Sequence, residues 1–128
     1  MHWKIAAAVS VGGAIGTCLR YAINTMITTE SWFNATLIVN CSGSFLLGMI
    51  SGWFLASSKR EWIRLGLGTG LCGGYTTMST FAGESVRFAT ETGGHLAPYL
   101  FLSLAGGLIA AAVGFLTGKT LGERRCPQ

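Results

Sequence analysis

LGLGTGLCGGYTTMSTFAGE, at Leu65–Glu84, is the stretch that decides the fold of this chain. It carries no charge before Glu84 and is long enough to cross the hydrocarbon core of a bilayer. It is nevertheless poor material for a continuous helix, because the Gly73-Gly74 pair adds backbone freedom and the threonines that follow weaken helix preference. Lipid tolerates a broken helix only where protein or water satisfies the freed backbone groups, and transporters place ion sites at such breaks. We therefore predict a membrane helix that is broken near its middle, with an ion site at the break.

The composition places the chain in a lipid bilayer. Of its 128 residues, 11% are charged, whereas soluble domains carry about 25% charged residues. Long apolar tracts between the charges predict an all-α membrane protein with a single domain, residues 1–128, and four transmembrane helices. The net charge of +4 forms no basic stripe with interleaved aromatic residues, so no nucleic acid is expected as a partner. The spans are expected at about residues 3–27, 34–57, 64–84 and 96–118.

Positive charge is distributed unevenly about these spans. With four spans, both termini and the linker 59–64 lie on the same side of the membrane. Because Lys and Arg are enriched in cytoplasmic segments, we predict a multi-pass protein of the cell (inner or plasma) membrane, whose termini are cytoplasmic if its orientation is fixed. The other side holds only Arg20 and Arg87, whereas the first side collects Lys4, Lys59, Arg60, Arg64, Lys119, Arg124 and Arg125.

Small and polar residues inside the spans indicate close packing and ion contacts. Gly12 and Gly16 in the first span, like Gly48 and Gly52 in the second, have the GxxxG spacing that lets another helix approach closely. An amide side chain is costly in lipid and offers two donors, so Asn40 in the second span is a candidate for contact with an ion.

Two charged residues lie within or at the end of a span, and each has two interpretations. Arg20 is either an anchor whose guanidinium reaches the headgroups or a fixed positive charge that lines the entry of an anion. Glu84, at the end of the third span, is either an interfacial carboxylate or a group at a pore mouth. The residues alone leave both pairs of alternatives open.

The chemistry of the side chains indicates a channel and not an enzyme. The sequence has no Ser-His-Asp set, paired carboxylates, HExxH motif or phosphate loop. Carbonyls freed between Gly73 and Thr76 suit a hard cation such as Na⁺, and the electropositive ring edge of Phe81 can face an anion. Uncharged donors that can replace water around a small anion without trapping it are Asn40, Ser79, Thr80, Tyr99 and Ser103.

Three motifs together resemble the Fluc (CrcB) fluoride channels. They are GLCGGYTTMSTFAGE at 70–84, GGAIGTCLR at 12–20 and ATLIVN at 35–40, and they are followed by Tyr99 and Ser103 in the fourth span. Their order and spacing extend over the whole chain. The resemblance implies a fluoride-selective ion channel that exports F⁻ passively and so reduces fluoride toxicity. It also implies an antiparallel, dual-topology dimer with two pores and a central structural Na⁺.

The same resemblance implies roles for individual residues. The backbone carbonyls of Gly73 and Thr76 match the positions that hold Na⁺. Arg20 matches the vestibule arginine, and Glu84 matches the carboxylate that follows the third-span motif. The residues at pore positions are Asn40, Met78, Ser79, Thr80, Phe81, Tyr99 and Ser103.

Two positions depart from the family pattern. Met78 stands where a phenylalanine is common, and Gly107 stands where a serine often continues the polar track. A thioether is polarizable but has no ring edge, so one half of the usual aromatic pair is altered. The uneven charge opposes insertion in both orientations, which leaves a homodimer and a heterodimer with an oppositely oriented paralogue as alternatives. The homodimer is favoured because one chain carries the hydroxyls, Asn40 and Phe81.

Two rival functions are less compatible with the residues. A small four-helix multidrug or cation exporter needs a carboxylate deep in its first span, whereas this span contains Arg20 and no acid. A membrane assembly subunit that transports nothing would explain the GxxxG spacings. It would leave the broken third span and the stacked hydroxyls without a purpose.

Overall fold

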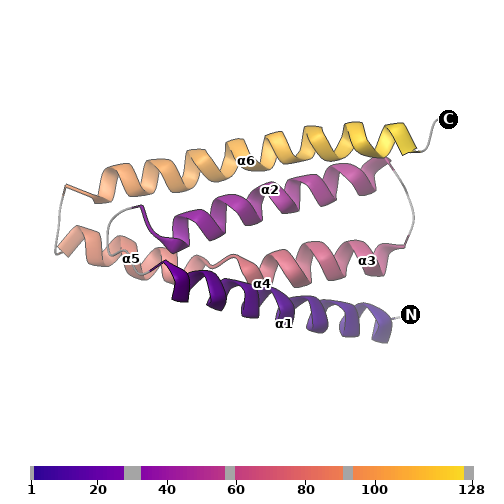
Figure 1. Ribbon diagram of the computed structural model, residues 1–128, viewed down its shortest axis with the longest axis horizontal. Helices are drawn as coiled ribbons and strands as arrows, with labels where there is room; N and C mark the ends of the chain where they lie inside the picture. The colour runs from indigo at the N-terminus through magenta and orange to yellow at the C-terminus, as the bar shows by residue number, and fades with distance from the viewer. Residues whose placement is uncertain (1, 28–32, 57–59, 91–93, 126–128) are drawn as a thin grey trace.

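All regular structure in the described part of the chain is helical. The computed structural model describes residues 2–27, 33–56, 60–90 and 94–125. Three long helices, α1 (His2–Met26), α2 (Ala35–Ala56) and α6 (Leu96–Arg125), accompany a fourth, interrupted segment. That segment consists of α3 (Glu61–Leu65), the π-helical η1 (Gly66–Cys72), α4 (Gly73–Tyr75) and α5 (Met78–Thr90). The four segments lie along the long axis of the molecule, with both termini at the same end (Figure 1).

The interruption lies at Thr76 and Thr77, directly after the glycine pair. Helix α4 ends at Tyr75, and Thr76 is extended, with φ −78° and ψ 162°. The break predicted between Gly73 and Thr76 is therefore present at the C-terminal end of that range, whereas Gly73 and Gly74 are themselves helical. Gly74 has a packing role instead, since a Cβ there would lie 2.9 Å from the Cα of Gly13 on α1. The threonines carry the break because the Asn40 side chain supplies partners for the backbone of Thr77.

Glycines bring the helices together in two pairs. Helix α1 packs on η1 and α4, where a Cβ at Gly16 would lie 2.7 Å from the amide nitrogen of Tyr75. Helix α2 packs along α6, where a Cβ at Gly52 would lie 2.8 Å from the amide nitrogen of Lys119. The prediction from the GxxxG spacings is confirmed for both helices. Gly114 and Gly118 on α6 complete the second contact, because each faces the backbone of α2.

Three of the helices are long and apolar enough to cross a membrane, namely α1, α2 up to Leu55, and α6 up to Arg124. The third segment begins at Glu61 and continues to Thr90, beyond the expected bounds of 64 and 84, and α6 continues past the expected end at 118. Polar side chains in these helices have partners within the same helix. Ser85 donates to the Phe81 carbonyl, and Lys119 lies 3.9 Å from Glu123 one turn later. Lys59 lies outside the described residues.

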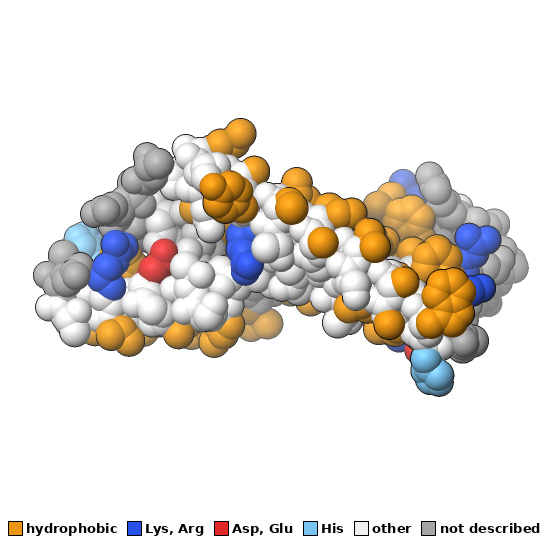
Figure 2. Space-filling model, turned by 90° about the horizontal axis from the view of Figure 1, so that it is seen from below, with side chains coloured by type: hydrophobic (Ala, Val, Ile, Leu, Met, Phe, Trp, Pro, Cys, Tyr) orange, Lys and Arg blue, Asp and Glu red, His pale blue; other side chains and the backbone are white. Residues whose placement is uncertain are grey.

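Large apolar side chains cover much of the outer surface. On α6, Leu108 is 74% exposed and Phe101 is 70% exposed, whereas the fully buried large side chains of the described chain are Tyr99 and Val39. Hydrophobic side chains are spread along the face seen in Figure 2, and its positive charges gather mainly toward the two ends. A soluble monomer rarely exposes apolar surface on this scale. The surface therefore suits a lipid bilayer, in agreement with the composition.

The glycine contacts predict that a Gly→Ala substitution destabilises the protein at Gly48 but not at Gly83. Gly48→Ala places a methyl group against the Ala111 backbone of α6 and should destabilise the protein by about 1–3 kcal/mol, as overpacking does. Gly83→Ala, on α5, meets nothing within 4 Å and should be neutral or stabilising by up to ~1 kcal/mol because alanine favours helix. Unfolding midpoints of the detergent-solubilised variants measure the difference. Equal midpoints for the two variants would contradict the close contact of α2 with α6.

Candidate ion pathway at the helix break

Asn40 joins α2 to the break in the third segment. Its Nδ2 donates to the carbonyl of Thr77 at 3.0 Å, and its Oδ1 accepts from the amide of Thr77 at 2.8 Å. One side chain therefore satisfies both backbone groups of the residue at which the helix is interrupted, which is what a break inside a membrane requires. One amide hydrogen of Asn40 remains for another acceptor, since Nδ2 carries two hydrogens. We name this pair of bonds the Asn40–Thr77 clasp.

The clasp changes the environment of two carbonyls that the sequence analysis singled out. In a continuous helix the Thr77 amide would donate to the Gly73 carbonyl, but here it donates to Asn40. The Thr76 carbonyl accepts from Nη1 of Arg20 at 3.1 Å. At least part of the Arg20 guanidinium is therefore directed to the break.

Hydroxyls gather where α5 begins. The Oγ1 of Thr77 accepts from the amide of Thr80 at 3.2 Å, so Thr77 caps this helix. The same Oγ1 lies 3.0 Å from the Thr80 hydroxyl and 3.3 Å from the Ser79 hydroxyl. Ser79 and Thr80 are both exposed at the surface of the single chain. Thr77 is a functional candidate that the sequence analysis missed, although a threonine three residues before Thr80 has the spacing of an N-cap.

A second polar cluster lies between α2, α5 and α6. Tyr99 donates to Oε2 of Glu84 at 2.7 Å, and Thr36 donates to Oε1 at 3.0 Å. The ring of Tyr99 lies between two phenylalanines, with centroid distances of 5.5 Å to Phe81 and 5.0 Å to Phe88. Glu84 therefore connects three helices, a structural role that neither interpretation of this carboxylate included. Thr36 and Phe88 were not among the predicted site residues.

Two further positions on α6, Ser103 and Gly107, were singled out from the sequence. Ser103, one turn after Tyr99, has a buried Oγ without a hydrogen-bond partner among the described residues. At Gly107 a Cβ would lie 3.6 Å from the Oγ of Ser44, so the glycine faces α2. A serine there would bring a second hydroxyl beside Ser44.

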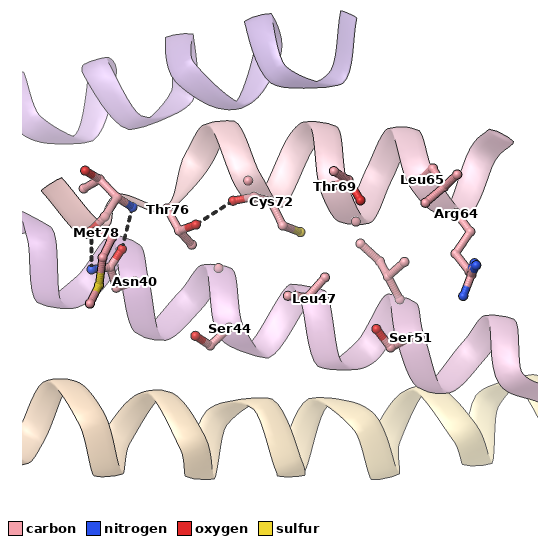
Figure 3. A pocket seen from close by; sticks show the side chains of 15 residues that line it. Asn40, Ser44, Leu47, Ser51, Arg64, Leu65, Thr69, Cys72, Thr76 and Met78 are labelled. Carbon is pink, nitrogen blue, oxygen red and sulfur yellow. Dashed lines mark hydrogen bonds between the residues drawn. The ribbon is translucent and has the colours of Figure 1, made fainter. Parts of the chain in front are cut away.

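An open cavity of about 570 Å³ extends from the break along α2. In Figure 3, Asn40 and Met78 lie near one end of it and Arg64 lies near the other. Met78 is 73% exposed, so the residue that replaces the usual phenylalanine is available to another surface. Arg64 had been assigned only to a charged linker, and its place in the cavity wall was not predicted. The remaining lining comprises Gly43, Ser44, Leu47, Ile50, Ser51, Leu65, Gly68, Thr69, Cys72, Gly73, Thr76 and Thr77.

The structure brings most of the predicted residues together in three groups. Asn40, Gly73, Thr76 and Met78 line the cavity beside the break. Phe81, Glu84 and Tyr99 form the cluster between α2, α5 and α6. Ser79 and Thr80 belong to the hydroxyl group at the start of α5, next to the break. A single chain therefore offers polar groups at the break, at the start of α5 and between α2, α5 and α6.

The fold and the site define an all-helical, multi-pass membrane protein with a polar break in one membrane segment. Residues 7–115 match the family model described as CrcB-like protein, Camphor Resistance (CrcB), and the chain belongs to this family. The matched relatives are named ion channels, which are not enzymes.

Three relatives illustrate the similarity. The "Fluoride-specific ion channel FluC 2" of Halalkalibacterium halodurans is 43% identical over 122 residues, which are 95% of this chain and 91% of that protein. The protein of the same name from Bacillus subtilis is 42% identical over 118 residues, 92% of this chain and 90% of that protein. The "Fluoride-specific ion channel FluC" of Bordetella avium is 41% identical over 119 residues, 91% of this chain and 94% of that protein.

The Glu84 cluster predicts a stability difference between two tyrosines. Tyr99→Phe removes a buried hydroxyl that donates to Glu84, and it should destabilise the protein by about 1–3 kcal/mol. Tyr21→Phe makes the same chemical change on a side chain that is 71% exposed, and it should have little effect. Unfolding midpoints in detergent compare the two variants. A Tyr99→Phe protein as stable as Tyr21→Phe would show that the hydrogen bond contributes nothing to the fold.

Proposed function

We propose that this chain is a subunit of a fluoride-selective ion channel that exports F⁻ passively across the cell membrane and so lowers fluoride toxicity. The observation that carries the proposal is the clasped helix break, with uncharged hydroxyl donors beside it, in a chain that is more than 40% identical to proteins named fluoride-specific ion channels. Uncharged donors can replace the hydration shell of a small anion without trapping it, which conduction requires. An inside-negative potential drives anions outward by about 2.3 kcal/mol per charge per 100 mV, so no energy-coupling site is needed.

The pore residues have distinct roles in this channel. Ser79, Thr80 and Ser103 supply hydroxyl donors, and Asn40 supplies the amide hydrogen that the clasp leaves over. Phe81 presents its ring edge, while Tyr99 holds that ring in place from a centroid distance of 5.5 Å. Met78 contributes a polarizable surface where a second ring is usual. Arg20 attracts the anion at the vestibule, and Glu84 lies at the far end of the route.

Two copies of the chain complete the channel as an antiparallel, dual-topology dimer with two pores. A single chain leaves the cavity beside the break open and Met78 73% exposed, so a second surface is needed to enclose a route. A homodimer is the first form to test, and a heterodimer with an oppositely oriented paralogue is the second. In the heterodimer each chain would have a fixed orientation, and the positive charges of this chain would place its termini in the cytoplasm. The described charges on that side of the predicted topology are Lys4, Arg60, Arg64, Lys119 and Arg124.

A structural Na⁺ at the centre of this dimer belongs to the same proposal. Backbone carbonyls are the hard oxygen ligands that such a cation prefers. The Gly73 carbonyl fits, because its helical amide partner is bonded to Asn40 and a Cβ at Gly73 would meet nothing within 4 Å. The Thr76 carbonyl fits with one of its two lone pairs, since Arg20 uses the other. Two carbonyls from one chain are too few ligands for a hard cation, so the same carbonyls of a second copy would complete the site. The bound ion would supply positive charge between the carbonyl dipoles.

Anion efflux from liposomes that contain this chain alone tests the proposed function. We expect rapid loss of fluoride and retention of chloride, because the donors surround a route suited to a small anion. Empty liposomes are the control for leakage. Equal loss of both anions would contradict fluoride selectivity. Absence of fluoride loss both from the chain alone and from the chain mixed with a candidate paralogue of opposite orientation would contradict the channel itself.

A further inference from the structure

An apolar groove follows α1 at the end of the molecule where both termini lie, and its volume is about 480 Å³. Trp3, Ala7 and Val11 line it at every fourth position, so they lie along one face of the helix. These positions span roughly 12 Å of the helix axis. Trp62, on the neighbouring helix α3, lines the groove as well. The groove is therefore a slot that runs in the direction in which α1 crosses the membrane.

The groove is hollow because small side chains of α1 lie between large ones. Ala7 and Ala8 line it behind the two tryptophans. A Cβ at Gly66 would lie 3.0 Å from the Cβ of Ala8, so the third segment touches α1 directly beside the groove and fixes its position. Trp3 and Trp62 are 71% and 42% exposed, so they project outward from this contact. The packing of the two segments thus leaves an apolar slot open to the surroundings of the protein.

The groove has a positive charge at its outer end. Among the described residues that line it, Lys4 alone is charged, and its Nζ lies 5.9 Å from the centre of the Trp3 ring. No ion pair joins Lys4 to an acidic side chain in the part of the chain that the structure describes. Arg60 and Glu61, directly before Trp62, are both exposed and carry opposite charges. Figure 2 shows hydrophobic side chains beside Lys or Arg side chains at this end of the molecule.

We propose that this groove binds an anionic phospholipid of the leaflet that lies on the side of the termini. The phosphate lies at Lys4, and one acyl chain passes the two tryptophans toward Val11. Tryptophan suits this depth because indole rings settle at the level of the headgroups, and a lysine near the surface favours anionic lipid. An unpaired cation at the end of an apolar slot complements a molecule with a negative head and a hydrocarbon chain.

A lipid in this groove is compatible with the dimer proposed above and does not depend on fluoride conduction. The groove shares no lining residue with the cavity beside the helix break, where a second copy of the chain would pack. The lipid therefore occupies a different surface of the third segment. Failure of the fluoride efflux experiment would leave this inference untouched, because lipid binding is measured without any ion flux.

Quenching of tryptophan fluorescence by brominated lipids tests the proposal, because bromine on an acyl chain quenches an indole that it touches. The full chain is reconstituted into vesicles of equal parts phosphatidylglycerol and phosphatidylcholine, with the bromines on one lipid or on the other. The signal of the groove is the quenching that is lost in the Trp3→Phe/Trp62→Phe protein. We expect an affinity about fivefold higher for phosphatidylglycerol, since one lysine near the surface favours anionic lipid by about that factor.

Two pairs of variants locate the headgroup and the acyl chain. Lys4→Gln should make the two lipids nearly equal, whereas Lys119→Gln, which removes the same charge at the same end of the molecule from α6, should keep the preference. Ala7→Leu fills the slot and should lower the quenching by both lipids. Its control is Ala6→Leu, the same change at an exposed position of α1 that does not line the groove, and it should leave the quenching unchanged.

Four results would overturn the lipid site. Equal affinity of the unchanged protein for both lipids would remove the anionic preference. A preference that survives Lys4→Gln, or one that falls equally in Lys119→Gln, would assign it to the overall charge of this end. Equal quenching in Ala7→Leu and Ala6→Leu would place the acyl chain elsewhere. Groove tryptophans that neither lipid quenches would show that another protein surface covers the groove.

Discussion

The structure depends on satisfying the backbone of Thr77 inside a membrane segment. A helix interrupted in lipid loses amide and carbonyl partners, and each unsatisfied group costs several kcal/mol. Asn40 supplies both partners from the neighbouring helix through bonds of 2.8 and 3.0 Å. These bonds remove most of the free-energy cost of the interruption. The interruption in turn leaves the Gly73 and Thr76 carbonyls without their usual hydrogen bonds from the amides four residues later. The candidate cation ligands lie at this break, and the hydroxyls at the start of α5 and the cavity along α2 lie beside it.

Close packing by glycine holds the helices on either side of the clasp in two pairs. Helix α1 lies against the backbone of η1 and α4, and α2 lies against the backbone of α6, because the glycines at these contacts carry no side chain. The Glu84 cluster then fixes α5 relative to α2 and α6 through two hydroxyl donors. The polar groups of the site are therefore held by contacts between helices.

Sequence reasoning predicted the helical class, the broken segment and the glycine contacts, because each follows from composition or from spacing along one helix. It placed the break between Gly73 and Thr76, whereas in the structure the glycines are helical and the interruption begins at Thr76, where Asn40 offers a partner to Thr77. The pairing of Glu84 with Thr36 and Tyr99 joins residues far apart in sequence, and no local pattern encodes it. The π-helical turns of η1 were likewise not predicted, because they arise where Gly70 meets the backbone of α1. Assignment of individual residues to pores, to Na⁺ and to a dimer remains a prediction from the family resemblance.

Fluoride efflux from liposomes that contain Asn40→Ala tests most directly whether the Asn40–Thr77 clasp shapes the anion route. The matched control is Ser44→Ala, a smaller truncation one turn further along the same cavity wall. We expect Asn40→Ala to lose nearly all fluoride efflux while the protein still inserts into the membrane, and Ser44→Ala to keep most of it. Fluoride efflux from Asn40→Ala at the rate of the unchanged protein would contradict the claim, because the route would then be independent of the clasp.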